Sequence, residues 1–327
     1  PISVLVGLFL VAFFKPGVGL DPSLISQLVT QTPAPELLQS TKTVTEALIG
    51  LIPKNPLLAA SHALEGDMVA FMVFTLIFGI ALLLVRGEQE RDPLVAALES
   101  LRDVSMKIVD FAMIIAPLGV AGLMFTMTAK FGFDLIGNLG KYVMVVLLGL
   151  AIQQFVVLGA LLKFYAKKSP WEFFSQIKEA MITAFSTSSS NATLPTSIRV
   201  AETNLGLNRS ISSFVLTIGS AANQNGTALF EGVTVLFLAQ IFGVSLGFEQ
   251  QIVVLFMSVI AGMGTAGVPG SSIPMIMIVL QSVGVPPEGI GLVLGVDRLL
   301  DMCRTVLNVT GDLVCAQVVD YSERKRS

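Results

Sequence analysis

The sequence predicts an all-α membrane protein with several membrane spans. Of its 327 residues, 53% are hydrophobic and only 13% are charged, whereas soluble globular proteins usually carry about 25% charged residues. Its mean hydropathy is +0.79. The apolar runs at 68–85 and 143–162 approach the roughly 20 residues that cross the hydrocarbon core of a bilayer. We therefore expect helices embedded in lipid.

Charge and rare residues exclude several other classes. The net charge of −3 gives no sign of nucleic-acid binding. Cys303 and Cys315 have no second cysteine pair beside them, so a zinc site or disulfide framework has no support. The single histidine, His62, lies in a polar stretch and is expected to be an ordinary loop residue.

The first half predicts helices of ordinary span length. Residues 1–14 form an apolar helix end that closes at Lys15-Pro16-Gly17, and no initiator Met or charged leader precedes them, so we expect residue 1 to cut into a span, with earlier spans missing. Residues 18–64 suggest short helices and loops at the membrane surface. Spans are expected at 66–86, 97–129 and 136–166, with a charged loop at 86–93.

Basic residues set the expected orientation. The loops at 86–107 and 163–178 are separated by two spans and are rich in Lys and Arg. Such loops remain on the cytoplasmic side. We expect the C-terminal residues Arg324, Lys325 and Arg326 to lie there too.

The second half predicts two re-entrant hairpins, at 171–203 and 247–283. Each has two apolar arms of roughly 12–16 residues around a polar or glycine-rich turn, which is too short to cross the bilayer. The alternative, two loops outside the membrane, would leave apolar arms in water. Such re-entrant backbone survives at depth only when it is buried in protein or lines a wet cavity.

Each hairpin precedes a further span, at 207–243 and 288–320. The first is broken by the polar stretch 223–227, which frees backbone carbonyls that suit Na+. The repeated order of hairpin and helix suggests an inverted repeat, an architecture that binds its cargo near the bilayer midplane.

The last span carries one polar stripe. Spacings of 4, 3, 4 and 4 place five side chains on one helical face, those of Asp297, Asp301, Arg304, Asn308 and Asp312. Ionised groups inside a membrane usually face a functional interior. An arginine fork suits a carboxylate, and Asp312 offers a hard oxygen to a cation. The stripe therefore predicts binding of an amino acid with a second carboxylate, and the open alternative is a set of internal salt bridges.

The polar motifs resemble those of the dicarboxylate/amino acid:cation symporters, a family that includes glutamate/aspartate transporter homologues. The order and spacing of the motifs match over nearly the whole chain. The matching stretches are Thr187-Ser188-Ser189-Ser190 with Thr193-Leu194-Pro195, Asn223-Gln224-Asn225-Gly226-Thr227, 264–270, and Asp301-Met302-Cys303-Arg304-Thr305 with Asn308-Val309-Thr310-Gly311-Asp312.

The resemblance implies an elevator-type glutamate transporter fold in a homotrimer. Residues 1–130 would be mainly scaffold and trimerisation part, made of the end of the third span and the fourth and fifth spans, although the start of the chain would belong to the transport part. Residues 131–327 would form the transport domain, with the sixth span, both hairpins, the broken seventh span and the eighth span. The expected location is the plasma (inner) membrane.

The resemblance also implies roles for individual residues. Arg304 would bind the side-chain carboxylate of the substrate, Asp301 and Thr305 its amino group, and Asn308 its main-chain carboxylate. The remaining substrate contacts would come from Ser189, Ser190, Thr227, Val268, Pro269 and Gly270.

One or two Na+ ions are expected as coupling ions. The first would lie among Gly219, Asn223, Asn308 and Asp312, and the second among Ala221, Gly262, Met263 and Thr265. A third site, at Asn223 and Asn225, is in doubt because sodium-coupled members usually have Asp where Asn225 stands. Glu231 matches a position that carries a proton in eukaryotic relatives, so H+ coupling is a second hypothesis, with a structural carboxyl as its alternative.

The predicted function is symport of aspartate or glutamate, driven by Na+, H+ or both. Arg304 and Asp301 together favour this cargo over neutral amino acids or plain dicarboxylates, which remain alternatives. An anion channel and an intramembrane serine hydrolase, suggested by the serines at 186–190, are other readings. Serine hydrolases need a base beside the nucleophile, and His62 is far away in the sequence, so we expect no enzyme.

Overall fold

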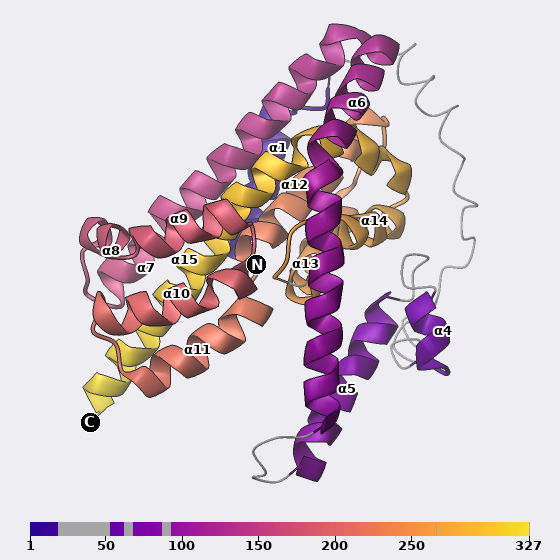
Figure 1. The fold of residues 1–327 in the computed structure, drawn as a ribbon. Coiled ribbons are helices and arrows are strands. Elements are labelled where there is room, and N and C mark those ends of the chain that lie inside the picture. The colour runs from indigo at the N-terminus through magenta and orange to yellow at the C-terminus, as the bar shows by residue number, and fades with distance from the viewer. Residues whose placement is uncertain (19–52, 62–67, 87–92, 266, 327) are drawn as a thin grey trace. The chain divides into compact units, whose positions relative to one another are not determined.

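The chain consists of helices, and no strand occurs in the part that the structure describes. This computed structural model describes residues 1–18, 53–61, 68–86, 93–265 and 267–326. Most of the surface segment expected at 18–64 lies outside the described residues, and so does His62 within it. The interior of the charged loop 86–93 lies outside them as well. The chain divides into two compact units, Pro35–Leu123 and a larger one of Pro1–Ala34 with Met124–Ser327 (Figure 1).

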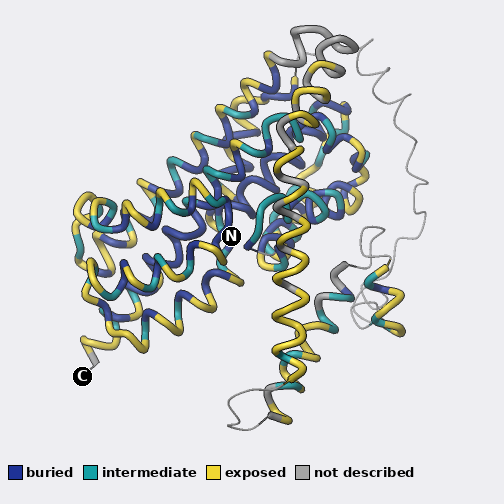
Figure 2. The backbone as a smooth tube through the Cα atoms, viewed as in Figure 1, coloured by how far each residue is buried: buried dark blue, intermediate teal, exposed yellow. Residues whose placement is uncertain are grey.

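The smaller unit contains α4 (Pro56–Ser61), α5 (Met68–Arg86) and the first part of α6 (Pro93–Ala151). Apolar side chains on α5 and α6 are exposed, among them Leu84, Ile114 and Leu118, and Figure 2 shows this exposure along both helices. Exposed apolar faces of this size are typical of a surface that contacts lipid or another protein.

The prediction of two separate helices at 97–129 and 136–166 is wrong. A single helix, α6, runs through both and continues into a π-helical turn, η2 (Ile152–Val157), and α7 (Leu158–Phe164). The stretch 130–135 contains one glycine and no proline. One glycine costs a helix only about 1 kcal/mol, so it does not break it. The stretch Gly137–Phe164 is the one described helix long and apolar enough to cross a membrane.

The core of the larger unit is α12 (Asn225–Ile241), which is buried along almost its whole length, including the polar side chains of Thr227, Glu231 and Thr234. It packs against α1 (Ile2–Phe14), α13 (Phe248–Gly264), α14 (Ser272–Ser282) and α15 (Leu294–Arg326). The Gln240 side chain fastens the end of α1, because its Oε1 accepts the Gly17 N–H at 2.9 Å and its Nε2 donates to the Val11 carbonyl.

Both helical hairpins predicted from the sequence are present as packed helix pairs. The first pairs α9 (Lys178–Thr187) with α10 (Ser190–Thr203) after a short α8 (Pro170–Gln176). Its turn contains Ser188 at φ 50°, in the left-handed region. The second pairs α13 (Phe248–Gly264) with α14 (Ser272–Ser282).

The broken span is confirmed as α11 (Arg209–Ala222) and α12, separated at Asn223 and Gln224. The last span begins with a 3₁₀ helix, η3 (Pro287–Leu292), and continues as α15 (Leu294–Arg326). In Figure 1, α15 runs through the larger unit beside α9, α11 and α12, with which it packs. This arrangement brings the polar stripe of α15 to the helix break and both hairpin turns.

Candidate substrate and ion site

Asn308 of α15 holds the start of α12. Its Oδ1 accepts the backbone N–H of Gly226 at 2.7 Å, and its Nδ2 donates to Gln224 Oε1 at 2.5 Å and Thr227 Oγ1 at 3.0 Å. The first N–H groups of a helix have no partner within it. The buried Asn308 amide therefore provides a hydrogen-bond partner for the Gly226 N–H in the first turn of α12 and joins α12 to α15.

The break also needs a glycine at 226. A Cβ atom built on Gly226 would lie 2.5 Å from the carbonyl oxygen of Arg304 and 3.1 Å from Asn308 Oδ1. Any side chain there would collide with backbone that cannot move aside. Gly226 therefore lets α12 begin in direct contact with α15.

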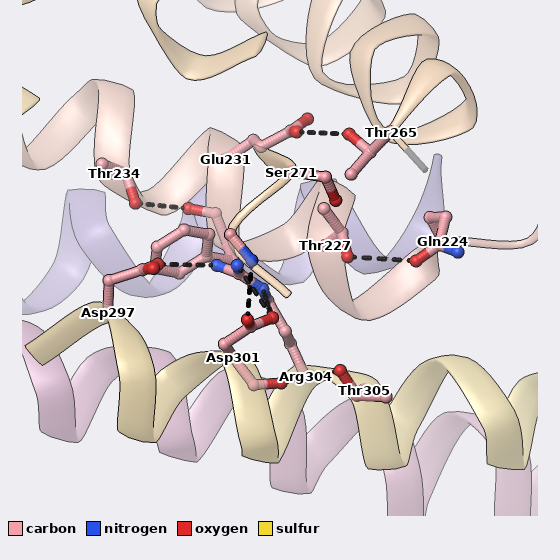
Figure 3. Close-up of polar contacts among 12 residues, drawn as sticks. Gln224, Thr227, Glu231, Thr234, Thr265, Ser271, Asp297, Asp301, Arg304 and Thr305 are labelled. Carbon is pink, nitrogen blue, oxygen red and sulfur yellow. Dashed lines mark hydrogen bonds and ion pairs between the residues drawn. The ribbon is translucent and has the colours of Figure 1, made fainter. Parts of the chain in front are cut away.

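Arg304 is buried, with 2% of its surface exposed, and all three of its guanidinium nitrogens are engaged. Nε and Nη2 contact Asp301 Oδ1 at 3.0 and 2.9 Å, and Nη1 contacts Asp297 Oδ1 at 3.1 Å (Figure 3). The guanidinium carbon lies 4.3 Å from the centre of the Phe230 ring, within the range of a cation–π interaction. In this structure all three guanidinium nitrogens of Arg304 are therefore paired with carboxylates of the chain itself.

The two hairpin turns meet each other beside this ion pair. Ser189 Oγ donates to the Gly267 carbonyl at 2.6 Å, and the Asn191 N–H donates to the same oxygen at 3.3 Å. Across the site, the Gly270 N–H donates to Asp301 Oδ2 at 3.0 Å. Hydrogen bonds therefore tie the second turn to the first turn and to α15.

A small cavity of about 10 Å³ lies between these elements. One water needs roughly this much space, so an amino acid would need the hairpin turns to separate. The lining residues are all small, polar or charged apart from one valine: Ser188, Ser190, Gln224, Thr227, Thr265, Gly267, Val268, Ser271, Asp301, Arg304, Thr305 and Asn308.

Asp312 forms a second polar centre, two turns of α15 beyond Arg304. Its carboxylate is 3% exposed and accepts one hydrogen bond, from Asn223 Nδ2 at 2.7 Å. A Cβ on Gly219 would lie 2.6 Å from Asp312 Oδ1. The Asn225 amide lies close to Gly311, and its Oδ1 is buried without a hydrogen-bond partner in the described part of the chain. Under-satisfied buried oxygens of this kind suit a small hard cation.

Comparison with known proteins identifies the family. The model of the sodium:dicarboxylate symporter family matches residues 1–322. This chain belongs to the sodium:dicarboxylate symporter family. The chain is 34% identical to the proton/sodium-glutamate symport protein of Bacillus subtilis over 326 residues, 98% of this chain and 73% of the relative.

Two further relatives support the family assignment. The proton/glutamate-aspartate symporter of Escherichia coli is 33% identical over 330 residues, 99% of this chain and 74% of the relative. Human excitatory amino acid transporter 3 is 34% identical over 301 residues, 89% of this chain and 56% of the relative. The family consists of transporters rather than enzymes, and it makes this chain an integral membrane protein.

Most of the residues predicted for this symporter's site lie together. Seven of the predicted substrate residues line the cavity, namely Ser190, Thr227, Val268, Asp301, Arg304, Thr305 and Asn308. Ser189 and Gly270 contact its walls by hydrogen bonds, whereas Pro269 is not among the lining residues.

The residues predicted to bind sodium or to carry a proton differ in their contacts and burial. Gly219, Asn223 and Asp312 are in contact. Met263 is 58% exposed, whereas Gly262 and Thr265 are buried. Glu231 is fully buried, and its Oε1 accepts from the Thr265 hydroxyl at 3.3 Å.

Sequence reasoning missed the support beneath Arg304. Tyr142 of α6 is fully buried, stacks on Phe237 at 4.5 Å between ring centres, and shares a hydrogen bond of 2.8 Å with Thr234. The Thr234 hydroxyl in turn donates to the Phe230 carbonyl at 2.7 Å. A lone tyrosine inside an apolar span was the available signal, because a buried phenol needs a partner.

Proposed function

We propose that this protein is a symporter of acidic amino acids, aspartate or glutamate, driven by gradients of Na+ and H+. One observation carries the proposal: a buried Arg304 fork lies beside the Asp301 carboxylate, between two hairpin turns. The fork suits the side-chain carboxylate of the cargo. Asp301 suits its ammonium group. Relatives whose names include glutamate or aspartate symport support the same cargo.

Binding requires an exchange of ion pairs. Arg304 now contacts Asp301 and Asp297, so a substrate carboxylate must take the place of at least one of them. Exchange of one carboxylate for another keeps the charge of the guanidinium neutralised in a medium of low dielectric constant, where an unpaired charge is costly. The Ser189–Gly267 hydrogen bond must also open to admit the cargo. Thr305 and Asn308 complete the proposed pocket.

The proposed mechanism is that of an elevator. The two hairpins would be re-entrant, since α9 has 10 residues and α14 has 11, too few to cross a bilayer. The larger unit would carry the cargo, and the smaller unit would belong to the fixed scaffold of a homotrimer. The division of the chain into two units supports this partition. The C-terminus, with Arg324, Lys325 and Arg326, would face the cytoplasm.

Sodium ions are proposed as co-transported cargo at Gly219, Asn223, Asn308 and Asp312. The buried Asp312 carboxylate with its single amide partner supports this site. The Asn223 amide would rotate to present its oxygen to the ion. A second sodium ion would bind at Ala221, Gly262, Met263 and Thr265, on α11 and the end of α13, two helices that pack against each other.

Proton coupling is proposed at Glu231. The fully buried carboxyl has one partner, Thr265, and its Oε2 has none among the described residues. Asn225 would make the third sodium site weak, since a neutral amide holds a cation less well than a carboxylate. We therefore propose that coupling leans on protons, with fewer sodium ions than in relatives that have Asp there.

Uptake of radiolabelled aspartate into proteoliposomes tests the function. We expect uptake with either an inward Na+ gradient or an inward H+ gradient, and the most with both. Serine in excess should compete poorly, and succinate should compete less strongly than glutamate. Competition by serine but not glutamate would instead establish a neutral amino acid symporter, and competition by succinate alone a dicarboxylate symporter.

Arg304→Ala tests the site within that assay. The variant should lose acidic substrate binding, because no other described cation reaches the cavity. It also leaves Asp297 and Asp301 without their partner, which costs about 3–5 kcal/mol for a broken buried pair, so size-exclusion chromatography must confirm that the protein still assembles. Unchanged aspartate affinity in an assembled variant contradicts the cargo assignment.

A further inference from the structure

A second arginine lies next to the proposed site and has no assigned role. Arg298 is on α15, three residues before Asp301 and six before Arg304. It is half-buried, and its Nη1 is shielded from solvent without a hydrogen-bond partner among the described residues. A buried guanidinium N–H without a partner is costly, so it needs an explanation.

Asp301 has a closer cation than Arg298 in this structure. Its carboxylate contacts Arg304 and accepts the Gly270 N–H of the second hairpin turn, and Asp297 shares the Arg304 guanidinium with it. Arg304 is the closest cation and supplies two contacts to Oδ1. In this conformation Arg298 is therefore a secondary partner, one helical turn away.

The proposed binding step changes that balance. When the substrate carboxylate takes the Arg304 fork, Asp301 loses its closest cation at the moment when it must be ionised to accept the substrate ammonium. A residue three positions earlier on the same helix face is within reach of Asp301. The free N–H of Arg298 is the donor available to replace the lost contact.

We propose that Arg298 is a positioning residue that takes over Asp301 while Arg304 binds the substrate carboxylate. This inference rests on the proposed function of the site. Arg298 does not touch the substrate; it holds Asp301 charged and correctly aimed at the ammonium group. Its contribution should therefore be limited to cargo that carries an amino group.

Binding measured by calorimetry on the purified protein separates this role from direct recognition. Arg298→Met should weaken aspartate binding about tenfold, the effect of losing one charged hydrogen bond, and should leave succinate, which has no amino group, within about twofold. Arg298→Lys should restore most of the aspartate affinity, because it returns the charge. Arg209→Met, at an arginine whose side chain is 90% exposed, is the matched control and should change neither ligand.

Thermal unfolding without substrate tests the same exchange independently of the cargo. Removing Arg304 by Arg304→Met imitates the step in which its fork leaves Asp301. Arg298→Met should then lower the unfolding midpoint about twice as much as it does in the wild-type background, a non-additivity that reports coupling. Adding Asp301→Asn should abolish the difference, and the milder Arg304→Lys background replaces Arg304→Met if that protein does not fold.

The outcomes distinguish the two proposals. Equal losses for aspartate and succinate, or an additive unfolding cycle, would overturn the role of Arg298 even in a protein that transports aspartate. Wild-type protein that binds no acidic amino acid would overturn the proposed function, and the unfolding cycle alone would then decide whether Arg298 and Arg304 share Asp301.

Discussion

Arg304, Asp297 and Asp301 form a buried ion-pair cluster in which one carboxylate can be exchanged for another. The guanidinium has three contacts with Asp297 and Asp301 and lies over the Phe230 ring. A buried ion pair of this kind adds little net stability compared with apolar packing. Its value lies in being exchangeable, since a carboxylate from outside can replace one from inside at small cost.

Glu231 is the second ionisable residue whose role can be isolated. Its Oε1 already accepts a hydrogen bond from Thr265, which a glutamine oxygen can accept equally well. Glu231→Gln therefore keeps the shape of the site and removes the exchangeable proton. We expect uptake to lose its dependence on a pH gradient while Na+-dependent aspartate binding persists.

Proteoliposome uptake at two internal pH values, with Na+ held constant, measures that change. Gln224→Glu is unsuitable as a control because Gln224 contacts Asn308, so the exposed Glu249→Gln on α13 serves instead. Uptake by Glu231→Gln that still rises with an inward H+ gradient would show that Glu231 is a structural carboxyl.

Among the helices, α11 and α12 show how a broken span is built. Asn308 of α15 accepts the Gly226 N–H at the break, and Gly226 lets α12 lie in direct contact with α15. The same contact orients Thr227, whose hydroxyl lines the cavity. The break is therefore both a structural joint and a wall of the site.

Gly226→Ala tests this joint. The added methyl group would lie 2.5 Å from the Arg304 carbonyl oxygen, and overpacking of this kind typically costs about 1–3 kcal/mol. We expect a lower unfolding midpoint and weaker aspartate binding, since α15 and α12 must move apart. Both are measurable by thermal shift with and without aspartate.

Gly140→Ala on α6 is the matched control for that substitution. A Cβ there meets nothing within 4 Å, and alanine favours a helix by up to about 1 kcal/mol over glycine. The control should be neutral or slightly stabilising. A Gly226→Ala protein that behaves like this control would contradict the close approach of α12 and α15.

For the whole molecule, the division into two units matters most. An elevator requires the larger unit to move as a body while the smaller one stays fixed. Its internal packing around α12 and α15 is extensive, with polar contacts between segments as distant as 154 and 310. Dense internal packing of this kind favours movement as one body.

Distances between spin labels test this motion. We expect labels at exposed Leu101 in the smaller unit and exposed Trp171 in the larger one to give a distance distribution that shifts when Na+ and aspartate are added. The labels replace both residues by cysteine in a background in which Cys303 and Cys315 are serine.

A second pair within the larger unit, at exposed Trp171 and Phe248, should keep its distance under all conditions. An identical distribution for the first pair in every ion and substrate condition argues against the elevator. A shift of equal size in both pairs would mean internal rearrangement instead of movement as a body.

The helical class, the two helix pairs of the hairpins, the broken span and the polar stripe of α15 are all predicted correctly from the sequence. These features are local: apolar run length, turn residues and a spacing of 3 or 4 residues are properties of one segment. The two spans expected at 97–129 and 136–166 are joined in α6, because the single glycine between them, Gly132, costs a helix little.

The partners of each polar residue depend on tertiary packing and cannot be read from local sequence. Spacing places Arg304 and Asp301 on one face, but packing alone brings Gly267 to Ser189, Asn308 to the break at 224–227, and Tyr142 to Thr234. These pairs are separated by between 78 and 92 residues. Their contacts arise because buried polar groups must find hydrogen bonds wherever the fold places a partner, and that choice is a property of the whole packed unit.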